Sequence, residues 1–317
     1  MTGILTIGWG ETQPASRTRR TFETLSTLAA AALLTVSTAA TIMEQSALSN
    51  EDAAGGSATS GAAATLPTKE TMIGAYTGAP YHYPSTVRIG KDGGPTDLTI
   101  DPVEWYGDPF HNPIYYGARV ARWFGTGRAG MMVDFIHSKA MAELDKEASF
   151  SGTVNGEALP PRARIRDVVA KMEFSHGHNM LLFTGLMRLP SLGARISPYV
   201  GAGAGVLLPH AEVTLKSDNT PRTYEYNYAG PAGQALAGVE IRLSRMSFFV
   251  EYKYTYGAYD APLSQLNGSW LFLDLWRQFK RWTNGEEPPG GHVTTDIVSH
   301  QVVGGLAVRI AARPAAP

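Results

Sequence analysis

The strictest constraint on the fold is a two-residue alternation of apolar and polar side chains in SFFVEYKYTY, residues 247–256. In an extended strand, Phe248 and Val250 point to one face, whereas Glu251 and Lys253 point to the other. Segments 234–242 and 299–310 alternate in the same way. The chain is therefore expected to contain strands that separate an apolar side from a charged side.

Eight β-rich runs bounded by turn-forming residues follow Met72. They cover roughly 72–90, 114–125, 129–141, 174–189, 196–213, 226–243, 247–259 and 296–310. The connections between them alternate long and short, and the short ones are GTGR, PSLGAR and SRM. Tight turns on one side and long loops on the other are typical of outer-membrane barrels. We therefore predict an all-β, eight-stranded antiparallel transmembrane β-barrel over residues 71–310, with long extracellular loops and a short tail at 311–317.

The charged faces of these strands are expected to point inward. Eight strands leave an interior that side chains can just fill, so a wide diffusion pore is disfavoured. A soluble eight-stranded barrel would have the opposite polarity, with apolar side chains inside. A soluble β-sandwich is the remaining structural alternative. The residues expected to fill the lumen as ion pairs are Arg119, Asp134, Arg188, Glu240, Arg242, Glu251 and Lys253.

The N-terminal segment predicts export. Arg17, Arg19 and Arg20 precede the uncharged stretch LSTLAAAALLTVSTAA, which ends in small residues. This is the arrangement of a cleaved signal peptide, expected over residues 1–40. Residues 41–70 are rich in Ala, Gly and Ser, a composition that predicts a flexible segment. The uncharged stretch is too short for a spanning helix, and no later segment offers about 20 consecutive apolar residues.

The composition limits the partners of the chain. It has 317 residues, of which 17% are charged, and a formal net charge of −1. Nucleic acid is therefore not an expected partner. The absence of cysteine excludes disulfides, thiolate metal sites and thiol catalysis. We expect a monomer in the cell outer membrane.

Histidines gather in the half of the barrel that should face the cell exterior. His176 and His178 begin the fourth run, and His210 and Glu212 end the fifth. Side chains at i and i+2 point the same way roughly 6.6 Å apart, and a turn near Gly193 would place His176 opposite His210. Imidazole with carboxylate suits Zn, Fe, Co or Cu. We hypothesise that these four residues bind one divalent transition metal; the alternative is a polar rim without a ligand.

A family resemblance rests on five segments between Met72 and Ile310. They are EWYGDPFHNPIYYGARVARWF, GMMVDFIHSKA, EFSHGHNMLLFTGLMRLP, PYVGAGAGVLLPHAEV and FFVEYKYTY. Within them, the SHG and PHAEV motifs are the most specific. Through them the chain resembles the lipid A oxidases of Gram-negative bacteria and the outer-membrane barrels grouped with them. The resemblance implies an enzyme that oxidises the proximal glucosamine of lipid A, the anchor of lipopolysaccharide, to 2-aminogluconate. It also implies a divalent metal, with molecular oxygen as co-substrate.

The last long connection contains the segment SWLFLDLWRQFKRW, in which apolar side chains recur at helical spacing. This pattern predicts a helix whose aromatic stripe enters the outer leaflet while its cations meet lipid phosphates. A helix that caps the mouth of the barrel is the alternative. The stripe consists of Leu271, Phe272, Leu275, Trp276, Phe279 and Trp282, opposite Asp274, Arg277 and Arg281.

Three function classes remain open on this basis. The first is a metal-dependent lipid A oxidase, and the second is a non-catalytic structural or adhesion barrel. The third is a lipid A acyl-chain hydrolase or transferase that uses Ser and His. Ser175 with His176, and Ser299 with His300, are neighbours along a strand and should point to opposite faces, so neither pair is expected to form a dyad. A Ser and a His from different strands would still satisfy the third class.

Overall fold

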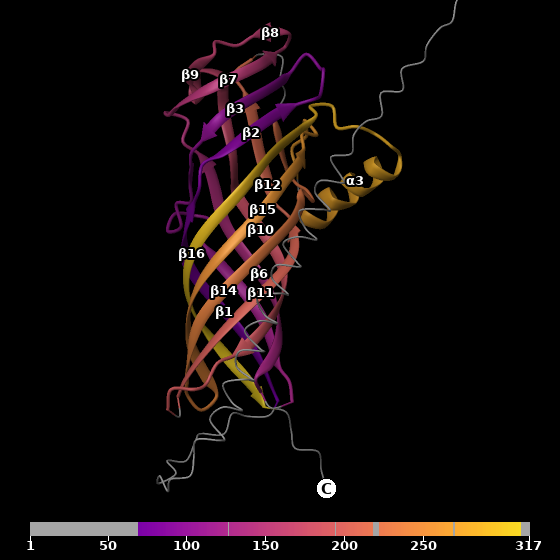
Figure 1. Ribbon diagram of the computed structural model, residues 1–317. Coiled ribbons are helices and arrows are strands. Elements are labelled where there is room, and N and C mark those ends of the chain that lie inside the picture. The colour runs from indigo at the N-terminus through magenta and orange to yellow at the C-terminus, as the bar shows by residue number, and fades with distance from the viewer. Residues whose placement is uncertain (1–68, 126, 194, 218–221, 269, 312–317) are drawn as a thin grey trace, which may run out of the picture.

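The computed structural model describes residues 69–311 apart from positions 126, 194, 218–221 and 269 (Figure 1). The predicted signal peptide, nearly all of the predicted flexible segment and the tail after residue 311 lie outside the described residues. Strands dominate the described part, which confirms the all-β prediction, and its helices are α2 (Ile165–Val168) and α3 (Leu271–Thr283). Neither of these helices is long and apolar enough to cross a membrane.

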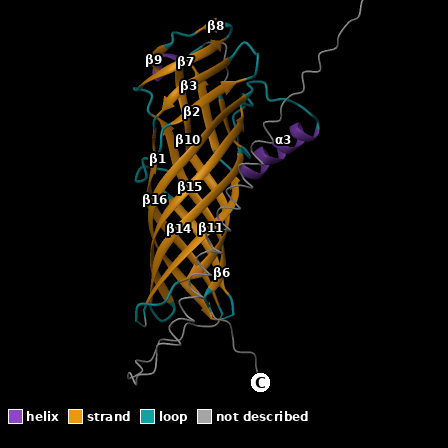
Figure 2. Ribbon diagram, viewed as in Figure 1, coloured by secondary structure: helices purple, strands orange, loops and turns teal. Residues whose placement is uncertain are grey.

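Long antiparallel strands follow one another around a barrel wall (Figure 2). The first wall strand pairs with the second on one side and with the last on the other, where Glu70 lies opposite Ala311 and His82 opposite Ser299. The first and the last wall strands are therefore hydrogen-bonded to each other. In order, the wall strands are β1 (Glu70–His82), β5 (Tyr116–Trp123), β6 (Ala129–Ala142), β10 (Val169–Arg188), β11 (Ile196–Leu207), β14 (Gly230–Arg242), β15 (Met246–Pro262) and β16 (His292–Ala311).

The two ends of the barrel differ. Short connections join β5 to β6, β10 to β11 and β14 to β15 at the lower end in Figure 1. At the other end the connections contain further strands. Five of them form an extension sheet that continues from the outer end of β16, β4 (Trp105–Tyr106) pairs with β6, and β12 (His210–Leu215) forms a hairpin with β13 (Thr223–Tyr226). The extension sheet consists of β2 (Ser85–Gly90), β3 (Asp97–Val103), β7 (Glu147–Val154), β8 (Glu157–Ala158) and β9 (Arg162–Arg164).

Prolines end two wall strands earlier than the sequence pattern suggests. The predicted run 72–90 splits around Pro84 into β1 and β2, and the predicted run 196–213 splits around Pro209 into β11 and β12. Proline has no N–H group to continue a ladder of hydrogen bonds. In both places the chain leaves the wall register and takes a new partner, so β2 pairs with β3 and β12 with β13.

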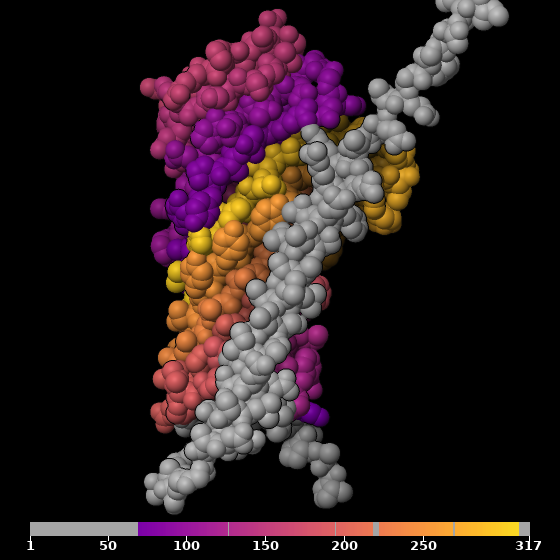
Figure 3. Space-filling model, viewed as in Figure 1, coloured from indigo at the N-terminus to yellow at the C-terminus, as the bar shows by residue number. Residues whose placement is uncertain are grey.

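The extension sheet has a hydrophobic core of its own. Val87, Leu98 and Ile100 are fully buried, and Phe150 of β7 is nearly so. Their burial explains why two of the predicted long loops are ordered as strands instead. In Figure 3 this sheet, indigo to magenta, forms a solid block on one end of the barrel.

The wall has apolar side chains outside and charged side chains inside. Val250 is 58% exposed, whereas the adjacent Glu251 and Lys253 are 1% and 0% exposed. This confirms the predicted orientation of the strands, and it is the polarity typical of outer-membrane barrels rather than of soluble ones. Other exposed wall side chains are Ile73, Val120, Met131, Phe183, Phe248, Val302 and Val308.

The middle of the lumen is filled by a charge network. Arg119 donates to both carboxylate oxygens of Glu251, at 2.5 and 2.7 Å. Lys253 Nζ lies 2.5 Å from Asp134 Oδ2, and the hydroxyl of Tyr76 donates to the other Asp134 oxygen at 2.8 Å. Because these side chains are all buried, the network blocks the lumen at this level.

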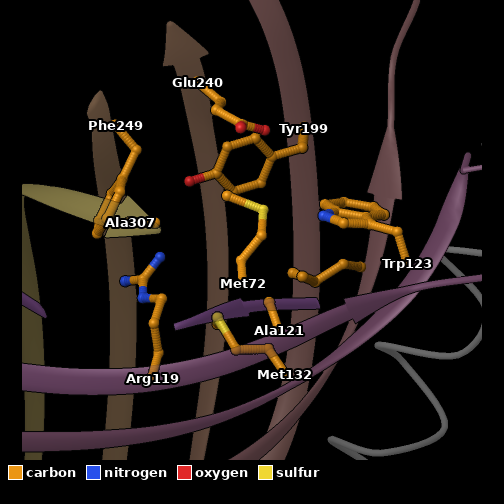
Figure 4. A pocket seen from close by; sticks show the side chains of 10 residues that line it. Met72, Arg119, Ala121, Trp123, Met132, Tyr199, Glu240, Phe249 and Ala307 are labelled. Carbon is orange, nitrogen blue, oxygen red and sulfur yellow. The ribbon is translucent and has the colours of Figure 1, made fainter. Parts of the chain in front are cut away.

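A second charge network fills the lumen near the short connections. Arg188 donates to Glu70 and, at 3.1 Å, to Glu240, while Arg242 donates to Glu70 at 3.0 Å. The structure therefore confirms that all seven predicted charges lie inside, and it adds Glu70. A cavity of about 30 Å³ beside Arg119 and Glu240 (Figure 4) holds little more than one water.

Candidate functional site on the outer wall

The strand that carries the SHGH motif is irregular where the motif lies. Phe174 of β10 pairs with Ala140 of β6, but the next pair is His178 with Ser138, so three residues of β10 lie opposite one of β6. Within this bulge Gly177 has φ +145°, a value that favours glycine. A bulge redirects the side chains on either side of it, which breaks the two-residue alternation locally.

His178 points into the lumen, in regular alternation with the buried Met180 and Leu182 that follow it, so it is His176 that the bulge displaces. The ring of His178 is fully buried and shares a hydrogen bond with the hydroxyl of Tyr259 on β15. It also lies 5.6 Å, between ring centroids, from His82 of β1. Contacts with two strands that are not its neighbours are made only across the interior. The expectation that His178 shares a face with His176 is therefore corrected.

The structure brings His176 and His210 together on the outer side of the wall. Their ring centroids lie 5.3 Å apart. Tyr224 of β13 contacts both rings, at 5.4 Å from His176 and 4.2 Å from His210, and Tyr226 lies 4.4 Å from His210. The two imidazoles thus form a pair lined by tyrosines, where the β12–β13 hairpin joins β10.

His210 is the better defined half of this pair. It is 5% exposed, and among the described residues its Nδ1 has no hydrogen-bond partner. Burial, together with the neighbouring His176, lowers the pKa of His210 to about 4. The imidazole is therefore neutral near pH 7 and keeps a free ring nitrogen, as a metal ligand requires.

Glu212 is committed to other charges. It lies opposite Glu173 on β10, and Lys171 Nζ is 2.9 Å from Glu212 and 2.6 Å from Glu173. Arg222 lies 3.5 Å from the other oxygen of Glu212. In the described part of the chain, no group of three or more His, Asp and Glu residues is placed to hold a metal ion. Of the four predicted ligands, only the two imidazoles of His176 and His210 fit a common ion as they stand.

The same bulge creates a contact that the sequence did not predict. Ser175 Oγ lies 3.3 Å from Nδ1 of His176, although neighbours in a regular strand point to opposite faces. The expectation that this pair cannot meet is therefore corrected. The expectation for Ser299 and His300 agrees with the structure, because Ser299 bonds His82 in the lumen while His300 bonds Tyr83 on the outer surface.

A cleft of about 360 Å³ lies close to the imidazole pair on the outer wall. His137 stacks on Tyr116, with ring centroids 4.5 Å apart, and its Nδ1 lies 2.7 Å from Asn179 Oδ1. Asn179 in turn donates to the Leu208 carbonyl at 3.0 Å, so that the Nδ1 of His137 is the donor and its buried Nε2 keeps a lone pair. The cleft is lined by Tyr116, Phe135, His137, Asn179, Tyr226, Trp270 and Leu271.

Sequence reasoning gave no role to His137 or to Asn179. The signal for Asn179 was its position one residue after the SHGH motif. Alternation counted back from the inward-facing Arg188 places Asn179 on the outer face, and in the register it lies directly opposite His137. The cleft also depends on the segment before α3. The local sequence pattern does not predict that this segment approaches the wall.

Comparisons with known proteins give fold neighbours but no family. No family model and no curated protein matches the chain. The solved structures that it resembles include Neisserial surface protein A, at 8% identity and TM-score 0.32, covering 76% of this chain and 97% of that one. The outer membrane protease OmpT from Escherichia coli aligns at 7% identity and TM-score 0.39, over 76% and 97%. Ail of Yersinia pestis, solved with a heparin analogue, aligns at 11% identity and TM-score 0.31, over 77% and 100%. Likeness at this level carries no functional argument.

A Gly177→Ala substitution is expected to disturb the bulge. A Cβ at this position would lie 2.1 Å from Asn179 Nδ2, and the positive φ disfavours any side chain. We expect a loss of about 1–3 kcal/mol in the free energy of unfolding, measured by urea titration of the refolded barrel. The matched control is Gly185→Ala in the same strand, where a Cβ meets nothing closer than 3.8 Å. Equal stability of the two variants would show that the bulge does not need glycine.

Proposed function

We propose that the protein is an eight-stranded outer-membrane β-barrel that modifies lipid A in the outer leaflet. The carrying observation is the location of the imidazole pair and the cleft on the apolar outer side of the wall. A lumen blocked by ion pairs offers no path for a substrate, whereas a site on the outer wall is open to lipid from the side. Lipid A, with a sugar headgroup above acyl chains, matches a site at the boundary between an apolar wall and a polar sheet.

The reaction that we propose is the oxidation of the proximal glucosamine to 2-aminogluconate. Support for it comes from the resemblance of the SHG and PHAEV segments to lipid A oxidases. His176 and His210 would hold a divalent transition metal, with Glu212 as a third ligand if its carboxylate exchanges Lys171 for the metal. The bound metal would supply the oxygen chemistry. The chain's own contribution is to keep His210 neutral and to hold it beside the exposed ring of His176.

A second candidate is an acyl-chain hydrolase. The observation that favours it is the contact between Ser175 Oγ and His176, which lies beside the same cleft. A hydroxyl within reach of an imidazole is the core of a hydrolytic dyad. Among its contacts with described residues, His176 has no carboxylate to orient its ring. We therefore rank this candidate second.

Mass spectrometry of lipid A, from cells with and without the gene, tests the proposal. We expect lipid A from the expressing cells to gain one oxygen atom, and we expect His176→Ala or His210→Ala to abolish the gain. Each variant must still migrate faster unheated than heated on a denaturing gel, which shows that the barrel has formed. Loss of an acyl chain would establish the hydrolase instead. Unchanged lipid A would favour a non-catalytic structural or adhesion barrel. Recovery of the protein as a soluble species would overturn the membrane placement.

A further inference from the structure

Helix α3 is attached to the barrel through its polar side. The side chain of Gln278 accepts from the backbone N–H of Tyr228 at 2.7 Å and donates to its carbonyl at 2.8 Å. Arg281 lies 3.0 Å from the buried carboxylate of Glu225, and Asp274 accepts from the N–H of Tyr226 at 3.3 Å. These contacts join α3 to the β12–β13 hairpin and the residues that follow it.

The opposite side of α3 is apolar and faces away from the protein. Phe272 and Trp282 are each 78% exposed, and Trp276 is 54% exposed. A helix on a protein in water buries its apolar stripe and exposes its charges. In α3 this arrangement is inverted, so an apolar medium must cover the aromatic side. The exposed stripe also includes Trp270, Leu273 and Phe279.

The position of α3 identifies that medium. The helix stands beside the wall and does not cover the open end of the barrel (Figures 1 and 2). Exposed tyrosines gather on the outer wall, where Tyr83 bonds His300 at 2.7 Å and Tyr254 packs on the same ring. Tyrosines are enriched where a membrane meets water. Tyr228, itself 49% exposed, is the residue that Gln278 of α3 holds.

The cations of α3 border its aromatic stripe. Lys280 is exposed, with its Nζ 5.5 Å from the ring centroid of Trp276, and it makes no ion pair with any described residue. Arg277 is half exposed and bonds Asp274 at 3.0 Å. A cation next to an aromatic stripe is the arrangement of helices that lie in a membrane interface and contact anionic lipid.

We propose that α3 lies in the outer leaflet, with its aromatic side among acyl chains and Lys280 at lipid phosphates. This inference rests on the outer-membrane placement proposed above, but not on the oxidase reaction. Trp270 and Leu271 line the cleft, so α3 also forms one side of the entrance to it. The aromatic stripe therefore reaches the cleft at Trp270, and a lipid bound there would lie beside His137.

Tryptophan fluorescence can test this placement because of where the tryptophans lie. Trp105 and Trp123 are buried, at 6% and 2% exposure, whereas the three of α3 are exposed. We would refold the full chain carrying Trp9→Phe, Trp105→Phe and Trp123→Phe into phosphatidylcholine vesicles. When the acyl chains are brominated, the emission of the α3 tryptophans should fall by more than half, while aqueous iodide should have little effect. Strong quenching by iodide without quenching by brominated lipid would overturn the inference.

Two further variants separate the causes. A chain with Trp9→Phe and with Trp270, Trp276 and Trp282 all replaced by Phe keeps only the interior tryptophans, and neither quencher should affect it. Lys280→Glu should reduce the quenching by brominated lipid in vesicles that contain phosphatidylglycerol, and an unchanged value would remove the phosphate contact from the proposal. Quenching by brominated lipid without any change in lipid A mass would leave α3 in the membrane while refuting the oxidase. Failure of the parent to show heat-modifiable migration would refute the barrel placement itself.

Discussion

Replacing Glu251 by Leu should destabilise the barrel by about 3–5 kcal/mol, because it leaves the Arg119 guanidinium charged and buried without its main partner. Arg119 makes its two shortest ionic contacts with Glu251, and Tyr199 also donates to this carboxylate at 2.5 Å. Asp134 lies 3.7 Å from Arg119 but is already bound by Lys253. Urea unfolding of the refolded protein in vesicles, followed by heat-modifiable migration, measures the loss.

The double variant Arg119→Met with Glu251→Leu should recover most of that stability, since apolar side chains of similar volume often replace a buried ion pair without loss. The matched surface control is Arg162→Ala, which removes an ion pair with Glu147 whose side chains are 70% and 60% exposed. Exposed pairs contribute about 0–1 kcal/mol, so this control should unfold nearly as the parent does. Equal losses for Glu251→Leu and Arg162→Ala would show that the lumen is hydrated and that the charges do not seal it.

The metal proposal predicts opposite outcomes for two histidines that are two residues apart. His176→Ala and His210→Ala should each lower the affinity for a divalent transition metal by at least about 100-fold, since even changes behind the ligands cost about 10–100-fold. His178→Ala should leave metal binding unchanged, because its ring lies in the lumen against Tyr259. Metal content of the purified full chain, loaded separately with Zn²⁺, Fe²⁺, Co²⁺ or Cu²⁺, is the measurement.

The control for this series is His300→Ala, which removes another imidazole from the outer wall at a place where Tyr83 already bonds it. All variants must keep heat-modifiable migration, so that a loss of metal is not a loss of fold. A parent that takes up none of the four metals, or a His178→Ala variant that loses as much as His176→Ala, would refute the proposed pair. The histidines would then be a polar rim of the barrel.

Much of the wall could be predicted from the sequence, because a strand's two-residue period is a local property. Alternation around Glu251 and Lys253 predicted which side chains enter the lumen, and all seven predicted charges are buried there. The short connections were recognisable by length alone. Glu70 was missed because it lies at the very start of the wall, where too few residues alternate to reveal the period. In the extension sheet, β2 fell within a predicted run, whereas β3, β7, β8 and β9 were missed because their burial depends on one another.

The candidate site was predictable only in part, because it lies where the local period fails. The spacing of His176 and His178 implied a shared face, but the bulge at Gly177 turns His176 to the outer wall while His178 keeps its regular place in the lumen. The same bulge brings Ser175 to His176, whereas Asn179 meets His137 through the regular register that follows it. The amino-acid composition of a strand does not reveal a bulge. The position of this bulge becomes visible only in the pairing of β10 with β6.

The sequence by itself determined the strand alternation, the charged lumen and the amphipathic character of α3, since each follows from the order of neighbouring residues. Only the tertiary structure decided which of two faces α3 presents to the barrel. Gln278 and Arg281 find partners at Tyr228 and Glu225, residues about 50 positions earlier, so the polar side docks and the tryptophans face outward. Contacts between segments so far apart in the chain depend on the strand pairing that brings them together, and the periodicity of either segment alone does not contain them.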